Sequence, residues 1–109
     1  MITEEFTRNA LQALEAEAPQ RLVEIMKEAA VRYATIRAEW ALSDQALRLE
    51  RDAERARAHD IFIDSINRLA RELTVSGYSI EWRDTLGNDR KLIGDFACYT
   101  ALVLGLQSR

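Results

Sequence analysis

Hydrophobic residues recur at spacings of three and four over most of this chain, which is the period of an amphipathic helix. The first such stretch follows Thr3, a residue type that caps helix N-termini, and ends near Ala18. Pro19 disfavours helical geometry at the residue before it but fits the first turn of a new helix. A second helix is therefore predicted from Pro19 to about Leu42. Its apolar stripe consists of Leu22, Met26, Ala29, Tyr33, Ile36 and Trp40.

Ser43 and Asp44 mark the next boundary, because both residue types cap helices. Either the chain turns back there as a helical hairpin or it continues as one long helix, and the two capping residues favour the hairpin. The charged segment that follows is interpreted as a solvated face with a thin apolar seam. Small residues in that seam predict close packing against a neighbouring helix. The seam consists of Leu42, Ala46, Leu49, Ala53 and Ala56.

The apolar face widens from Ile61 onward, and the helix is expected to end at Ser76 and Gly77. Apolar and polar residues then alternate from Tyr78 to Trp82, which is the period of an extended segment. The chain offers no second strand for this arm. We expect it to lie as a strap across the helices, with pairing to another chain as the alternative.

The turn after the arm leads into a last helix with Asp89 as its N-cap. Arg90 and Lys91 fall in the first turn of that helix, where the helix dipole disfavours cations. Together with Arg83 they indicate either a contact surface or an internal salt-bridge network that fixes the turn. The nearby aspartates favour the internal network.

The last helix is apolar on nearly all sides, which predicts a buried or oligomer-forming helix. A stripe of small residues on it would let another helix approach closely. A homodimer formed through this helix would then complete the burial. The stripe consists of Gly94, Cys98, Ala101 and Gly105.

Composition supports a helical fold. Of the 109 residues, 48% are hydrophobic and 30% charged, and only four glycines and one proline are present to interrupt helices. The chain is long enough for one modest core. We therefore predict one all-α domain over residues 1–109, a small bundle of about four helices with a short extended arm before the last.

Charge and cysteine content narrow the functional classes. The net charge of −3 argues against a general nucleic-acid binder, although 13 of the 15 basic residues are Arg, which suits forked contacts with carboxylates or phosphates. The single cysteine, Cys98, favours a reducing compartment. The start has no signal-peptide core, and the apolar run over residues 96–106 is too short to span a bilayer. A cytoplasmic protein without membrane contact is expected.

No residue pattern indicates catalysis. Asp60, Asp64 and Asn67 share one helix face and could hold Mg²⁺, but neighbouring arginines explain them as ion pairs, so we predict no metal site and no cofactor. His59, the only histidine, has no nucleophile placed beside it in a recognisable pattern. The chain is not expected to be an enzyme.

The segments FIDSINRLAREL (62–73) and WRDTLGNDRKLIGDFACY (82–99) resemble a small uncharacterised protein family carried on bacterial phages and integrative or conjugative elements. This resemblance covers about the C-terminal half. It implies no activity or cofactor, but it implies a setting in which small proteins bind and regulate or block host machinery.

Two functions follow as hypotheses. The first is a non-enzymatic protein-binding module, an inhibitor or regulator of a host defence protein, because Trp and Tyr beside Arg dominate interface energetics. The alternative is a nucleic-acid-associated accessory factor that contacts phosphates through its arginines. The predicted partner-binding residues are Tyr78, Trp82, Arg83, Asp89, Arg90 and Lys91.

Overall fold

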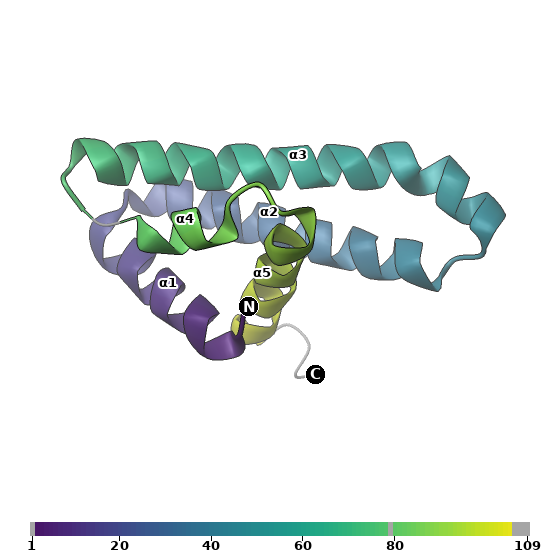
Figure 1. Ribbon diagram of the computed structural model, residues 1–109, viewed down its shortest axis with the longest axis horizontal. Helices are drawn as coiled ribbons and strands as arrows, with labels where there is room; N and C mark the ends of the chain where they lie inside the picture. Colours follow the sequence, from purple (N-terminus) through teal and green to yellow (C-terminus); the bar gives the residue numbers. More distant parts are fainter. Residues whose placement is uncertain (1, 79, 106–109) are drawn as a thin grey trace.

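The computed structural model describes residues 2–78 and 80–105, and helices make up most of them (Figure 1). The predicted all-α bundle is confirmed: 85% of the described residues are helical, and they contain no strand. Within those residues, no helix combines the length and hydrophobicity needed to cross a bilayer. The helices are α1 (Glu4–Glu17), α2 (Gln20–Leu42), α3 (Gln45–Val75), α4 (Glu81–Leu86) and α5 (Arg90–Val103).

The ends of α1 follow from its flanking residues, as predicted. The Thr3 hydroxyl accepts a hydrogen bond from the backbone N–H of Phe6 at 3.0 Å and satisfies one of the free donors of the first turn. At the other end, Ala18 is extended and Pro19 precedes α2. The predicted break between the first two helices is confirmed.

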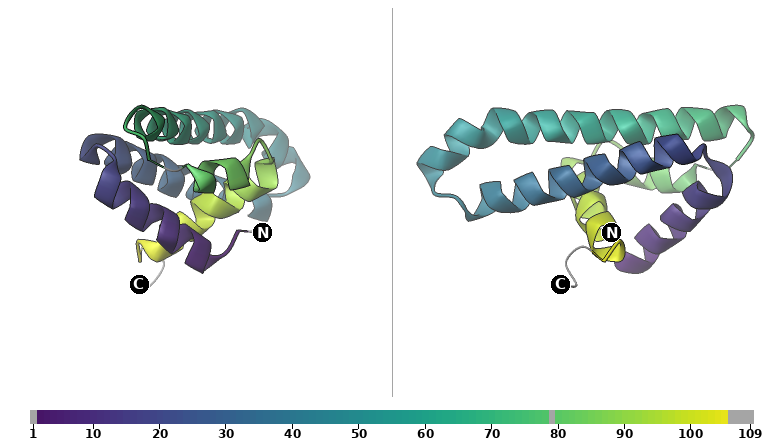
Figure 2. Two further views of the ribbon diagram at one scale, coloured as in Figure 1. Left: turned by 60° about the vertical axis from the view of Figure 1, so that its left-hand side comes forward. Right: turned by 180° about the vertical axis from the view of Figure 1, so that it is seen from behind.

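The chain turns back between α2 and α3, so the predicted hairpin is confirmed and the single long helix is excluded. Asp44 caps α3 by accepting the backbone N–H of Leu47 at 2.9 Å. The two helices run antiparallel along the longest dimension of the molecule, which is 47 Å (Figure 1). The other three helices pack between the middle of this hairpin and its open end, with α5 crossing near the middle (Figure 2).

Helix α5 lies at the centre of the fold and contacts all four other helices. Phe96 on α5 is fully buried and packs against the rings of Phe6, Phe62 and Trp82 at centroid distances of 6.1 to 6.2 Å. These contacts join α1, α3, α4 and α5 in one aromatic cluster. The apolar character of α5 on nearly all sides is thus explained by its central position.

The predicted close approach of a helix to the small-residue stripe is confirmed, and α2 of the same chain is that helix. A Cβ atom added to Gly94 would lie 2.7 Å from Cζ of Arg37 on α2. The same guanidinium lies 3.6 Å from Cys98 Sγ and 3.7 Å from an Asp95 carboxylate oxygen. Ala101 is fully buried. The burial that motivated the homodimer hypothesis is therefore largely supplied within one chain.

The prediction of an extended arm from Tyr78 to Trp82 is wrong from Glu81 onward, where α4 begins. Trp82 and Leu86 are one helical turn apart, and both are buried, at 6% and 0% exposure. The burial of this pair favours a helical turn over the period-two alternation that the residues from Tyr78 to Trp82 suggest. Ser79 lies outside the described residues.

Candidate protein-contact surfaces

Trp82, the strongest predicted contact residue, is part of the hydrophobic core. Its ring stacks on Phe96 at a centroid distance of 6.1 Å, and its indole Nε1 is buried without a hydrogen-bond partner. A side chain that is 6% exposed offers almost no surface to another protein. Its role in this fold is to hold α4 against α5.

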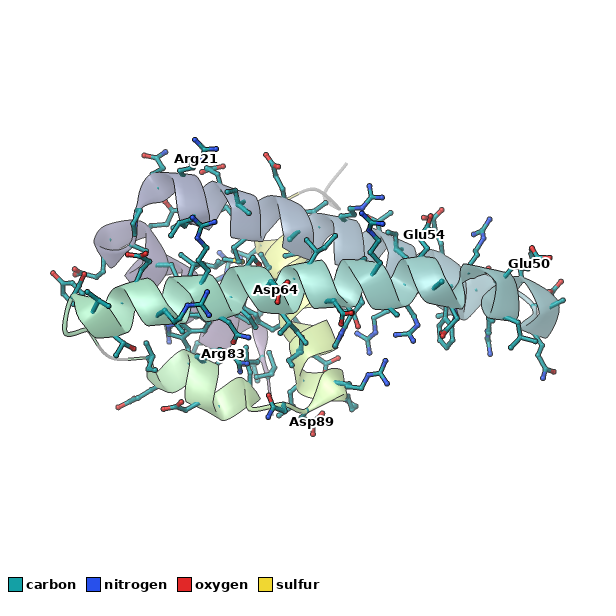
Figure 3. All side chains as sticks on the ribbon, turned by 90° about the horizontal axis from the view of Figure 1, so that it is seen from above. Arg21, Glu50, Glu54, Asp64, Arg83 and Asp89 are labelled. Atoms are coloured by element: carbon teal, nitrogen blue, oxygen red, sulfur yellow. The ribbon has the colours of Figure 1, made fainter. Side chains whose placement is uncertain are left out.

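Arg83 connects α4 to α3 and to its own turn (Figure 3). Its Nε donates to the Asn67 side-chain oxygen at 2.8 Å, and its Nη1 donates to the Gly87 carbonyl at 2.7 Å. The Asn67 oxygen, one candidate magnesium ligand, is thus already used by Arg83. Among the described residues, no group of three His, Cys, Asp or Glu side chains could hold a metal ion.

Asp89 and Lys91 stabilise the start of α5. An Asp89 carboxylate oxygen accepts the backbone N–H groups of Lys91 at 2.8 Å and Leu92 at 3.1 Å, as predicted for an N-cap. Lys91 Nζ pairs with Asp95 at 3.0 Å, one turn further on. This pair compensates for a cation near the positive end of the helix dipole. Arg90 is exposed beside them.

Tyr78 is half-exposed, at 46%, and interacts with the C-terminal end of α1. A hydrogen bond to the Glu17 carboxylate, and secondly its negative charge, raise the pKa of the Tyr78 hydroxyl above its ordinary value. This contact ties the chain after α3 to α1.

Two of the six predicted contact residues are withdrawn from the surface: Trp82 is buried and Arg83 is partly buried. Trp82 and Arg83 hold α4 against α5 and α3, whereas Asp89 and Lys91 make their contacts within α5. Tyr78 and Arg90 are exposed but lie on opposite sides of α4 along the chain. Of the charges that the sequence gathers around this turn, Lys91 and Asp95 pair with each other, and Arg83 bonds to the neutral Asn67 and Gly87 oxygens.

A different exposed region is the closed end of the α2–α3 hairpin, residues 39–55, which we term the distal hairpin. It extends beyond the other helices (Figure 1). Leu42 is 89% exposed and Leu49 is 75% exposed, values far from those of core leucines. The predicted apolar seam is therefore wrong, because its members Ala46 and Ala53 are also exposed and Ala56 is only partly buried.

In the distal hairpin, a partly buried Arg55 and an exposed Arg48 contact Trp40 of the facing helix instead. The guanidinium carbons of Arg48 and Arg55 lie 5.4 and 5.1 Å from the centre of the Trp40 ring. Both distances are in the range of cation–π attraction. Trp40 Nε1 donates to the Arg48 carbonyl at 3.2 Å, and Arg55 pairs with Asp52 at 2.9 Å. These contacts join α2 to α3 where the apolar core has ended.

The buried stripe of α3 explains this arrangement. Leu73, Leu69, Ile66 and Phe62 repeat at spacings of three and four, and continuing toward the N-terminus gives His59, Arg55, Asp52 and Arg48. In the N-terminal half of α3, the leucine and alanine residues lie outside that stripe. The signal was present in the sequence, because the same register that predicts the core also places the distal leucines on the outside.

A groove of about 970 Å³ runs along one side of the hairpin. Its α2 wall includes Glu24, Glu28, Val31, Thr35 and Glu39, which recur at three-residue and four-residue spacings and so form one stripe along the helix. Glu50 and Glu54 of α3, labelled in Figure 3, line it at the distal end. Leu104, just after α5, lines it from the other side.

Comparisons with known proteins provide no further assignment. No protein-family model, no curated protein and no solved structure matches this chain. The resemblance of the C-terminal half to a phage-borne family therefore stays an expectation from the sequence.

Proposed function

We propose that this protein is a protein-binding module whose contact surface is the distal hairpin. The observation that carries the proposal is that Arg48 and Arg55 lie over the Trp40 ring between the two helices while Leu42 and Leu49 face solvent. Outward leucines cost solvation without stabilising the fold. Two leucines exposed on a projecting hairpin, with charged residues around them, offer apolar area that another protein can cover.

The surroundings of the distal arginines weigh against the nucleic-acid alternative. Arg55 is held by Asp52 and Trp40, and Arg48 donates to the Ala41 carbonyl at 2.8 Å while lying over the same ring. Contact with phosphates would compete with these interactions. The acidic side chains interspersed among the arginines would repel a polyanion as well.

The test is affinity capture from a bacterial lysate with the whole chain as bait, followed by identification of the retained proteins. Leu42→Glu together with Leu49→Glu should abolish retention of the partner. The fold should be unaffected, since surface changes of this kind alter stability by about 0.5 kcal/mol or less. The expected thermal melt is therefore that of the parent chain.

Val75→Glu is the matched control, because Val75 is an equally exposed apolar residue, at 86%, at the opposite end of α3. It should retain the partner. Unchanged retention by the double leucine variant would reject the distal hairpin. Loss of retention with Arg90→Ala alone would place the contact on the α4–α5 turn instead.

A further inference from the structure

The groove along α2 has the dimensions of a binding site for one helix. Its lining residues span Glu24 to Glu39 on α2. At 1.5 Å per residue this corresponds to about 22 Å, or four helical turns. Because the α2 residues form a single stripe, an occupant that follows the groove lies alongside α2. An amphipathic helix does this by laying one face into the groove.

The floor of the groove is apolar and its rim is acidic. Val31, Ile36 and Leu104 supply apolar side chains along its length. Five glutamates and three cations line it, a net charge of −2. One of the cations, Lys27, is already paired with Glu15 and Glu24, so it contributes little free positive charge. The five glutamates are Glu24, Glu28, Glu39, Glu50 and Glu54.

We infer that this groove receives an amphipathic helix of the partner protein, with an apolar stripe against Val31 and Ile36 and lysines or arginines along its flanks. The inference rests on the proposed function and specifies the chemistry of the partner. Glu50 and Glu54 come from the distal hairpin itself, so the groove continues the proposed contact surface. The acidic rim attracts a basic helix and repels an acidic one, which supplies selectivity.

The probe is a fluorescent helical peptide of about 16 residues, long enough to cover four turns, with leucines at three-four spacing and lysines on both flanks. Fluorescence anisotropy against the whole protein should give saturable binding that weakens as salt is added. A peptide with the same leucines and glutamate in place of lysine should bind about tenfold more weakly or not at all.

Charge reversal on the protein locates the site. Glu50→Lys with Glu54→Lys should weaken binding of the basic peptide about tenfold, because two attractions become repulsions. Asp64→Lys with Glu72→Lys changes the net charge equally at exposed positions of α3 outside the groove and should alter the affinity by less than about twofold. Figure 3 labels Asp64, Glu50 and Glu54 on the same helix.

Three outcomes would overturn the inference: no saturable binding of the basic peptide, equal loss in both charge-reversal pairs, or a homodimer that the Glu50 and Glu54 changes dissociate. The last result would assign the groove to a second copy of the chain. If the basic peptide does not bind but the leucine variants still abolish capture, the groove inference fails and the proposed function stands. If the peptide binds but the leucine variants leave capture unchanged, the distal leucines are not the contact residues, and only the groove remains as a binding site.

Discussion

Trp82→Ala is expected to lower the free energy of unfolding by about 3–5 kcal/mol, the usual cost of removing a large buried aromatic side chain. The ring is 6% exposed and stacks on Phe96, the residue at which four helices meet. Domains of this size commonly have only about 5–15 kcal/mol of stability. A urea titration followed by circular dichroism should show a large fall in midpoint or partial unfolding in water.

Arg90→Ala is the matched control on the same turn, since Arg90 is exposed and lies in the first turn of α5. Its stability should stay within about 0.5 kcal/mol of the parent. A Trp82→Ala protein as stable as the parent would contradict the burial of this ring and restore Trp82 as a surface residue. If Trp82→Ala also loses binding to a partner, the stability measurement is needed first, because an unfolded variant loses binding whatever its contact surface.

Ala101→Leu is expected to lower stability by about 1–3 kcal/mol, because Ala101 is fully buried and a larger side chain must displace its neighbours. The melting temperature should fall by roughly 5–15 °C. Differential scanning calorimetry measures this directly.

Gly94→Ala is expected to change stability by less than about 1 kcal/mol, although Gly94 lies in the same stripe. The atoms that a new Cβ would meet belong to the guanidinium of Arg37, the flexible end of a partly exposed side chain. Moving Arg37 weakens its contacts with Cys98 and Asp95, while alanine gains about 1 kcal/mol in helix propensity over glycine. Equal losses in Gly94→Ala and Ala101→Leu would contradict this distinction.

Local signals in the sequence were enough to predict most of the fold. Thr3, Asp44 and Asp89 each cap the helix that the pattern assigned to them, because a capping bond involves only neighbouring residues. The long apolar stripes of α2 and of the C-terminal half of α3 predicted the buried faces for a similar reason: several turns of a helix give an unambiguous period.

Two features were predicted wrongly from the sequence. The five residues from Tyr78 to Trp82 are too few to separate a period of two from a period of 3.6, and Leu86, which decides the matter, lies beyond them. In the distal hairpin, the small apolar residues suggested a seam, whereas the register of the core places Arg48 and Arg55 there. Arginine can occupy such a position because its guanidinium lies over Trp40.

The predicted contact residues illustrate the limit of residue type as evidence. Trp, Arg and Asp are common in interfaces. The same residue types also form core contacts, hydrogen bonds between helices and helix caps within one chain. Only the fold shows that Arg83 bonds to Asn67, whereas the capping role of Asp89 could be predicted from the sequence. The structure shows that Leu42 and Leu49 are exposed, and this exposure makes the distal hairpin the better candidate surface.

Site-specific photo-crosslinking in cells tests the central claim, that the distal hairpin is the contact surface, most directly. A photoreactive phenylalanine analogue at position 49, 75 or 90 samples the distal hairpin, the far end of α3 and the α4–α5 turn, all at exposed residues. The account predicts a discrete adduct with one partner protein from position 49 and none from positions 75 and 90. An adduct from position 90 with none from position 49 would contradict it.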